Sequence, residues 1–295
     1  MNKTKILYLF TRTPLHVGAG ASVGAIDQPI QRERHTGFPI IPGTALKGVF
    51  ADAWNNTLQN GKRGAASDAS WLFGSDSDTE AAAGALQFSE AKLLAFPIRS
   101  ARGSFAWITS PLLLRRAVRD GVIPSDLLNN LAEPTDEKAI FDAGTESKLA
   151  LGSKVVLEEY TFEASGWLGL TQLSERLASL LAEDAVWKEI ISRLVVLSDG
   201  MMSFFAQNAC EVAQHVRISD ETGTAEGGAL FNQENVPSET LFYSVAHFFS
   251  GRGGKFKAKN PDDAVTELRN KLAGQVFQFG GDASTGLGYC TVKLS

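Results

Sequence analysis

The sequence predicts an α+β fold with long insertions, and three observations support this class. Short apolar runs typical of strands lie near both ends of the chain. Two segments carry helix start signals, one after Pro42 and one at Pro261. Without the insertions, the order is strand, helix, two strands, helix, strand, which is the ferredoxin-like, or RRM-like, pattern.

The N-terminal elements are predicted from apolar patterning and from proline. Residues 3–12 (KTKILYLFTR) predict a strand, because their continuous apolar run suits burial on both faces of a sheet. A long glycine-rich loop follows, and Thr44 then opens a helix whose apolar residues lie along one side. Pro111 marks the first turn of a further helix. Between these helices, strands are predicted at 84–97 and 104–109.

The C-terminal elements include the best-marked helix of the chain. It begins at Pro261, has acidic residues in its first turn, and ends with Lys271 and Gly274. After a polar stretch near 129–148, the other predicted elements are a strand at 154–164, two short helices within 172–197, a strand at 239–249, and final strands on either side of the glycine-rich loop 280–288.

A projecting β-hairpin is predicted at about 208–237, where two extended arms flank the polar segment DETGTAEGG. We expect a single domain over 1–295. Its ferredoxin-like core would comprise about 1–110 and 238–295, and the insertions would occupy about 111–237, including the hairpin.

Composition excludes several classes of protein. A chain of 295 residues that is 44% hydrophobic and 21% charged can bury a core, so disorder is excluded. No apolar run approaches the roughly 20 residues of a membrane span, and the N-terminus lacks a signal-peptide cleavage site. We therefore expect a soluble, cytoplasmic protein without membrane contact. The net charge of −5 argues against binding nucleic acid over the whole surface, although local basic groups remain possible.

Familiar catalytic and cofactor motifs are not found. The glycines near residue 20 miss the dinucleotide fingerprint, and no GxSxG sequence occurs. Cys210 and Cys290 are far apart and form no CxxC pair, so we expect core thiols. The four histidines show no i,i+4 pairing. His16 either acts as an acid or base or is an ordinary hydrogen-bonded loop histidine.

Two segments have the features of phosphate-binding sites. Lys47 lies in the first turn of a helix, where a cation is unfavourable unless an anion binds there or the side chain points into water. The C-terminal loop from Gly280 to Gly288 has bare backbone N–H groups and two hydroxyls that could lie along a sugar–phosphate chain. The competing reading is a tight connection between two strands. Together they predict a surface that binds an RNA backbone. The candidate RNA-binding residues are Gly18, Gly20, Arg32, Arg34, Thr44, Lys47, Ser284, Thr285, Gly286 and Gly288.

The stretch GAIDQPIQRERH places one carboxylate, Asp27, next to Pro29 and ahead of Arg32, Arg34 and His35. The carboxylate either takes part in chemistry at a phosphate or merely forms a turn before the proline. The residues themselves leave both readings open.

Several motifs together resemble the RAMP superfamily of CRISPR-associated proteins. They are HVGAG, FPIIPGTALKG and FGGDASTGLGY, and with IDQPIQRERHTGFP and LFNQENVPSETLF the chain resembles the backbone subunit of the type III-B Cmr effector complex over nearly its whole length. The resemblance implies a ferredoxin-like palm with a projecting thumb. It also implies copies that stack along a guide RNA (crRNA), pair it with target RNA, and assemble with the other Cmr subunits.

The resemblance also implies a cleavage site. Asp27 matches the family's catalytic aspartate, which promotes cutting of target RNA at regular intervals with a divalent metal. The metal, Mg²⁺ or Mn²⁺, would bind with RNA, since a lone aspartate offers few ligands. Glu234, at the base of the hairpin, is a second catalytic candidate, and a surface glutamate is the competing reading. The chain is therefore expected to be an endoribonuclease within the complex or, alternatively, a non-catalytic scaffold that binds guide RNA.

Overall fold

The first strand lies at the centre of the molecule, between two hydrophobic cores. In the computed structural model, β1 (Lys3–Thr11) is buried in all but its first three residues. Leu7 and Leu9 belong to one core, and Tyr8 and Phe10 belong to the other. Alternate side chains of a strand point to opposite faces of the sheet. The prediction that this run is buried on both faces is therefore confirmed.

The structure describes residues 2–20, 24–54, 58–59, 62–63, 68–75, 82–252 and 256–295. The strands after β1 are β2 (Ile40–Ile41), β3 (Leu58–Gln59), β4 (Lys62–Arg63), β5 (Leu86–Phe88), β6 (Ala91–Ser100), β7 (Ser104–Thr109), β8 (Lys138–Phe141), β9 (Lys154–Leu157), β10 (Tyr160–Ala164), β11 (Leu194–Val196), β12 (Glu211–Ile218), β13 (Ala225–Asn235), β14 (Leu241–Phe248), β15 (Val276–Gln278) and β16 (Tyr289–Leu294). The helices are α1 (Gly43–Asp52), α2 (Asp68–Phe73), α3 (Pro111–Arg119), η2 (Ser125–Leu128), α4 (Leu170–Leu180), η3 (Trp187–Ser192), α5 (Asp199–Asn208), α6 (Pro261–Leu272) and η4 (Ala283–Thr285).

One long sheet organises the chain, in the order β15-β16-β1-β14-β6-β7-β11-β8-β10-β9. In its first half, β16, β1, β14 and β6 are neighbours, and each adjacent pair is antiparallel. Helix α1 follows β1 and the short β2 in the chain, and α6 lies between β14 and β15, the strand that precedes β16. Phe50 of α1 and Leu268 of α6 are buried in the same core as Leu7 and Leu9. The predicted α+β class is confirmed.

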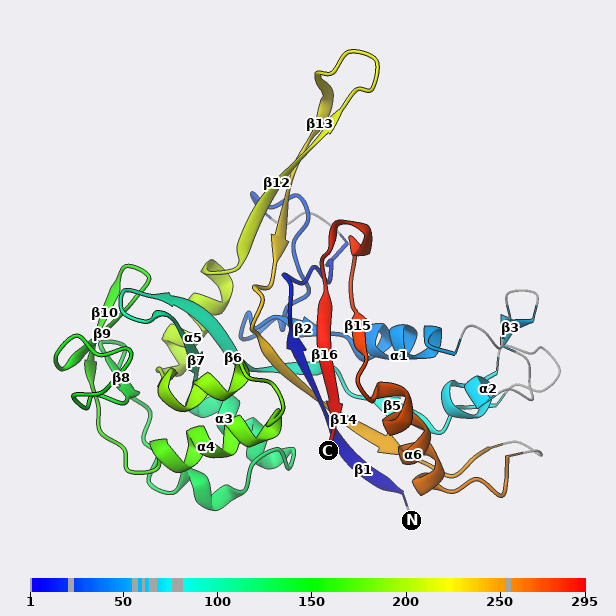
Figure 1. Ribbon diagram of the computed structural model, residues 1–295, viewed down its shortest axis with the longest axis horizontal. Helices are drawn as coiled ribbons and strands as arrows, with labels where there is room; N and C mark the ends of the chain where they lie inside the picture. Colours follow the sequence, from blue (N-terminus) through cyan, green and yellow to red (C-terminus); the bar gives the residue numbers. More distant parts are fainter. Residues whose placement is uncertain are drawn as a thin grey trace.

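The other face of β1 is covered by helices α3, α4 and η3. Leu114 of α3, Leu177 of α4 and Trp187 of η3 share a core with Tyr8 and Phe10. Figure 1 shows α3 and α4 on one side of β1, and α1 and α6 on the other. Both halves of the molecule therefore depend on the position of β1.

The helix ends follow the signals in the sequence. The side chain of Ser110 accepts a hydrogen bond from the third residue of α3, and Asn260 and Asp263 form a capping box at the start of α6. Gly274, just after α6, has a φ of 67°, a conformation that glycine adopts without strain. In the described part of the chain, no helix combines the length and apolar character required to cross a bilayer.

Several predicted boundaries are wrong. The strand predicted at 154–164 is the hairpin β9–β10, because the chain turns at Glu158, which has a φ of 49°. The strand predicted at 84–97 is divided into β5 and β6. Strand β8 lies in the stretch predicted to be polar, β11 lies within the predicted helical segment 172–197, and α5 was not predicted at all. Strands of three or four residues contain too few alternations to be recognised from periodicity.

The predicted hairpin is confirmed and consists of β12 and β13. These strands pair with each other from Glu211↔Asn235 to Val216↔Leu230, and a bulge follows Val216. They form a sheet of their own, and Figure 1 shows the hairpin extending well beyond the rest of the molecule. Its base therefore has to be held by other segments, since an isolated two-stranded hairpin is marginally stable.

A partly buried polar network joins α3 to the main sheet. The carboxylate of Asp120, at the end of α3, accepts hydrogen bonds from Lys92 Nζ at 2.8 Å and from Tyr243 Oη at 2.9 Å. Burial alone would raise the pKa of Asp120. The hydrogen bonds from Lys92 and Tyr243 outweigh this effect and lower the pKa below its ordinary value.

Replacing Asp120 should destabilise the protein. Asp120→Ala leaves Lys92 and the Tyr243 hydroxyl without their partner, so we expect the free energy of unfolding to fall by about 1–3 kcal/mol near pH 7. Because the folded state lowers the pKa of Asp120, its contribution is complete above the ordinary pKa and is lost as the pH falls through the lowered one. Urea unfolding at several pH values measures this difference.

The matched control for this change is Asp126→Ala, which alters an exposed aspartate of η2. We expect its effect to stay within about 0.5 kcal/mol. Equal stabilities of the two variants would contradict the role assigned to Asp120.

Candidate nucleic-acid interface at the base of the hairpin

The loop that carries Asp27 lies against the base of β13 and is held there by Asn232. The backbone N–H of Asp27 donates to Asn232 Oδ1 at 2.8 Å, and the backbone N–H of Asn232 donates to Asp27 Oδ2 at 2.9 Å. Asn232 Nδ2 also donates to the carbonyl oxygen of Ala25 at 3.0 Å. The side chain of Asp27 is exposed. The site is therefore an exposed carboxylate on a loop that is fixed to the hairpin.

Glu234 and Arg32 form an ion pair just below this contact. Arg32 Nη2 lies 2.5 Å from Glu234 Oε1, and the side chains are 19% and 9% exposed. The other carboxylate oxygen of Glu234 accepts from the backbone N–H of Ile30 at 3.0 Å. The catalytic role of Glu234 stays a prediction. In the structure, its buried carboxylate fixes the loop that follows Asp27.

The guanidinium group of Arg32 is hydrogen-bonded to several other segments of the chain. Besides Glu234, its guanidinium donates to the carbonyl oxygens of Gly37 at 2.6 Å and Ala206 at 2.7 Å, and to Cys210 Sγ at 3.3 Å. Arg32 is therefore poorly placed for the phosphate contact predicted from the sequence, because both of its Nη atoms already donate within the chain. Burial raises the pKa of the Cys210 thiol to about 12, so this cysteine stays neutral beside the cation.

Arg34 is the exposed arginine of the basic cluster. The neighbouring His35 is 72% exposed, and its Nε2 lies 3.1 Å from Arg116 Nη2. Arg116 in turn makes two hydrogen bonds of 2.9 Å to the carboxylate of Glu33. The cluster thus divides into residues that anchor the loop to α3 and one arginine available to solvent.

His16 connects the hairpin base to the C-terminal glycine loop. Its Nδ1 donates to the carbonyl oxygen of Glu234 at 2.7 Å, and its own carbonyl oxygen accepts from the N–H of Gly281 at 2.9 Å. It is buried, as expected of a hydrogen-bonded loop histidine. Gly18 follows closely and accepts from Gln31 Nε2 at 3.1 Å, while Gly20 is exposed with a φ of 91°.

The C-terminal loop packs tightly against the same region, below the hairpin (Figure 1). A Cβ atom on Gly280 would lie 2.0 Å from the carbonyl oxygen of His16, and one on Gly288 would lie 2.0 Å from that of Phe279. Glycine is required at both positions by this close approach. The prediction of bare N–H groups is wrong for much of the loop, because the N–H groups of 281 and 285–288 donate within the chain. Ser284 and Thr285 are exposed, with Thr285 Oγ1 bonded to the carbonyl oxygen of Asp282.

The start of α1 has the features of an anion site. Helix α1 begins at Gly43, one residue earlier than predicted, with no side-chain cap and no acidic residue in its first turn. Among the described residues, no hydrogen bond uses the N–H of Gly43 or Thr44. Lys47 is exposed and lines two adjoining hollows of about 310 and 600 Å³. Exposed N–H groups and a nearby cation are the donors that helix N-termini offer to phosphate.

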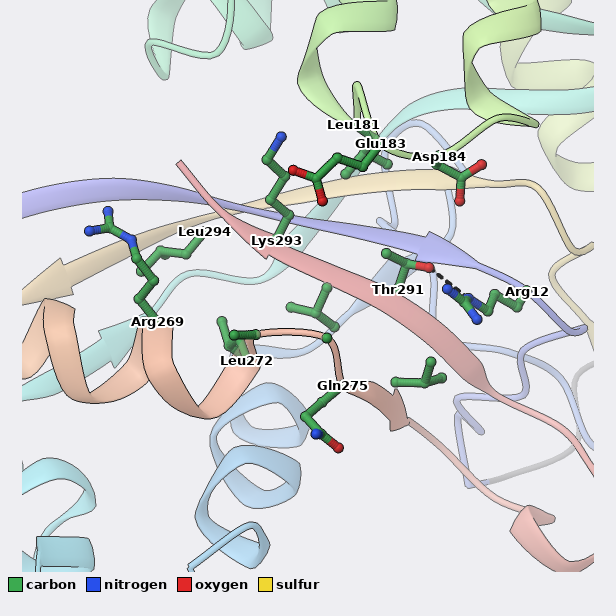
Figure 2. A pocket seen from close by; sticks show the side chains of 14 residues that line it. Arg12, Leu181, Glu183, Asp184, Arg269, Leu272, Gln275, Thr291, Lys293 and Leu294 are labelled. Atoms are coloured by element: carbon green, nitrogen blue, oxygen red, sulfur yellow. Dashed lines mark hydrogen bonds between the residues drawn. The ribbon is translucent and has the colours of Figure 1, made fainter.

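In the described part of the chain, no cluster of metal-ligating side chains accompanies these residues, and the pocket in Figure 2 is lined by none of them. Within the described ranges, no three histidine, cysteine, aspartate or glutamate side chains come together in a way that could hold a metal ion. Figure 2 shows a pocket of about 340 Å³ between the end of α6, β16 and residues 181–184. Arg12, Lys293 and Glu183 are among its lining residues, and none of the predicted site residues lines it. The candidate interface is therefore an open surface.

The fold and this surface define a class of protein: an α+β chain with a projecting hairpin, whose base fixes a loop with an exposed carboxylate. The family model of the RAMP superfamily matches residues 9–291. The chain belongs to the RAMP superfamily.

Individual relatives resemble the chain over its full length. The CRISPR system Cmr endoribonuclease Cmr4 of Pyrococcus furiosus is 32% identical over 302 residues, which cover 99% of this chain and 96% of the relative. The crystal structure of oligomeric Cmr4 from Pyrococcus furiosus has a TM-score of 0.70 at 27% identity and covers 99% of this chain and 98% of that one. A cryo-EM structure of the type III-B Cmr-beta complex bound to cognate target RNA contains a chain of the same fold, with a TM-score of 0.70, 22% identity and coverage of 99% and 97%.

The Arg32–Glu234 pair should contribute strongly to stability. Arg32→Met removes the cation and leaves a buried carboxylate uncompensated, so we expect the free energy of unfolding to fall by about 3 kcal/mol in urea unfolding. Arg34→Met, two residues away at an exposed position, is the matched control and should change it by less than about 0.5 kcal/mol. Similar values for both variants would mean that the buried pair is dispensable.

Proposed function

We propose that this chain is a backbone subunit of an RNA-guided CRISPR effector complex of type III-B. Copies of it would bind a guide RNA along a filament, together with the other Cmr subunits, and cleave complementary target RNA at regular intervals in the cytoplasm. The observation that carries the proposal is the exposed Asp27 carboxylate, fixed at the hairpin base in a chain that is 32% identical to a Cmr4 endoribonuclease over its full length.

The fold supports separate roles for the main sheet and for the projecting hairpin. We infer that β16, β1, β14 and β6, with α1 and α6, form the ferredoxin-like palm, since their order and antiparallel pairing suit that arrangement. The hairpin β12–β13 would be the thumb that separates successive segments of the paired RNAs. Its length and its isolation from the main sheet support this role.

Asp27 is the proposed catalytic residue. The resemblance to the RAMP superfamily implies cleavage that leaves a cyclic phosphate and a 5′-hydroxyl. Such cleavage requires the 2′-oxygen to attack the adjacent phosphorus while the bond to the 5′-oxygen breaks. The proton of the 2′-hydroxyl must be accepted by a base, and the departing 5′-oxygen must gain a proton. The backbone N–H of Asn232 donates to Asp27 Oδ2, and none of the described residues donates a hydrogen bond to Oδ1. One oxygen thus remains for a proton or a cation at the scissile phosphate.

A divalent cation, Mg²⁺ or Mn²⁺, is proposed to bind together with RNA. Hard cations take carboxylate and phosphate oxygens and waters, and the exposed Asp27 carboxylate supplies one such ligand. When bound, the cation would neutralise charge that develops at the phosphate. Asp27 would hold it at the scissile position.

The RNA backbone would be held by groups that recognise phosphate and not sequence. Lys47 and Thr44 at the start of α1, the exposed Arg34, and Ser284 and Thr285 of the C-terminal loop are the proposed contacts. Gly18, Gly20 and Gly286 would allow close approach of the RNA backbone. Gly288, predicted from the sequence as a further contact, is buried against Phe279 and is left out of the proposal. A guide must be accepted whatever its sequence, and contacts to phosphate provide this tolerance.

One observation favours the alternative, a non-catalytic scaffold. The hydrogen bonds between Asp27 and Asn232 give the carboxylate a structural role, as a turn residue would have. Binding of guide RNA would be the same in both cases, and only the source of the cleavage would differ.

Replacing Asp27 should separate cleavage from binding. In guide-loaded complexes, we expect Asp27→Ala and Asp27→Asn to lower target cleavage by orders of magnitude, because both remove the charge required by a cation or a proton. Target affinity should stay equal or rise slightly, since a negative charge near phosphates is lost. Target retention and cut products are measured in magnesium or manganese. Full cleavage by both variants would leave the chain as a scaffold.

Replacing Lys47 should weaken RNA binding without regard to sequence. Lys47→Ala removes one phosphate contact, so affinity for unrelated guide-length RNAs should fall by a similar factor, and the salt slope should decrease by about one. Filter binding at several salt concentrations measures both quantities. Lys188→Ala, at an exposed lysine of η3, is the control and should change neither. A loss confined to one RNA sequence would indicate base recognition instead.

A further inference from the structure

Asn232 makes four hydrogen bonds to the four-residue stretch that contains Asp27. Its side-chain amide spans the turn around Ile26, because Oδ1 accepts from the N–H of Asp27 and Nδ2 donates to the carbonyl oxygen of Ala25. Its backbone N–H donates to Asp27 Oδ2, and its carbonyl oxygen accepts from the N–H of Gln28 at 3.1 Å. An amide side chain is suited to this position since it offers a donor and an acceptor together.

The contacts fix the direction of the Asp27 carboxylate. With the N–H of Asp27 and the carbonyl oxygen of Ala25 both bonded to one side chain, the peptide groups on either side of the turn cannot rotate independently. The bond from the Asn232 N–H to Oδ2 then sets the orientation of the carboxylate itself. Among the described residues, no donor is bonded to Oδ1.

The hairpin side of the contact is equally well fixed. Glu234, two residues further along β13 and on the same face, accepts from the N–H of Ile30 and pairs with Arg32. Its own N–H donates to the carbonyl oxygen of Gln28 at 3.0 Å. The loop is therefore joined to the base of β13 by a single parallel bridge between Gln28 and Gln233, and Asn232 is its contact nearest to Asp27.

We propose that Asn232 is a positioning residue for RNA cleavage, which orients the Asp27 carboxylate through its side-chain amide. The inference rests on the proposed catalytic role of Asp27. Because Asn232 belongs to the projecting hairpin, the cleavage group and the hairpin are joined by one residue. A change in the position of the hairpin base is consequently transmitted to the carboxylate.

The test uses guide-loaded complexes that contain wild-type protein, Asn232→Ala, Asp27→Ala, or both substitutions. Asn232→Ala removes two of the four hydrogen bonds and retains those made by the backbone. We expect the single-turnover cleavage rate at saturating target to fall by about 10- to 100-fold, the loss associated with misplacing a catalytic group by about 1 Å. Target affinity, measured by filter binding, should remain within about twofold, because no proposed RNA contact is lost.

Gln214→Ala is the matched control. Gln214 pairs directly with Asn232 across the hairpin, so both side chains lie on the same face, and it is exposed. Its replacement should leave the cleavage rate unchanged. An equal loss in Gln214→Ala and Asn232→Ala would mean that any change in this hairpin slows cleavage, and it would overturn the specific role of Asn232.

The double variant distinguishes positioning from an independent contribution. Without the Asp27 carboxylate there is nothing to orient, so Asn232→Ala should cause no further loss in the Asp27→Ala background. Multiplicative losses would show that Asn232 acts separately, and would overturn the proposal. If Asp27→Ala abolishes cleavage and Asn232→Ala cleaves normally, this inference alone fails. If Asp27→Ala cleaves normally, the proposed function fails and the inference fails with it.

Discussion

The ion pair between Arg32 and Glu234 is the interaction on which the geometry of the candidate interface depends. It joins residues that are 202 positions apart in the chain and is largely buried. From Arg32, further hydrogen bonds reach Gly37 and Ala206, so the pair connects the Asp27 loop, the end of α5 and the base of the hairpin. A buried carboxylate without its cation is costly, and this penalty holds the three segments in one arrangement.

The position of this ion pair explains how a two-stranded hairpin can project so far from the molecule. Beyond its base, β12 and β13 have only each other as partners, and such a ribbon is weak by itself. Near Val236, the chain pairs with Leu15 through two hydrogen bonds of 2.8 and 2.9 Å. The hairpin thus continues directly from segments that are anchored next to β1, the strand buried between the two cores.

The distribution of charge favours the same surface for RNA. Residues 131–164 contain eight acidic and three basic side chains, a net charge of −5 that equals the net charge of the whole chain. This segment includes β8, β9 and β10, which lie at one end of the main sheet, away from β1 and β16 (Figure 1). The rest of the chain is balanced. This acidic segment repels phosphate, so the electrostatics are consistent with the proposed RNA path along the hairpin base and α1.

The sequence by itself determined the local features of this protein. The continuous apolar run of β1, the capping residues Ser110 and Asn260, and the two arms of the hairpin are encoded within a few neighbouring residues, because burial pattern, capping and turn formation act over short distances. The candidate Asp27 could also be found from its motif. Tertiary structure alone decided that Asn232 holds Asp27, that Glu234 is buried against Arg32, and that the N–H groups of the C-terminal loop are already bonded. The contacts of Asn232 and Glu234, and the bonds of the loop's Gly281 and Gly288 N–H groups to the carbonyl oxygens of His16 and Pro14, join residues that are about 200 or more positions apart. Strand register and packing of the whole chain, not local propensity, bring such partners together.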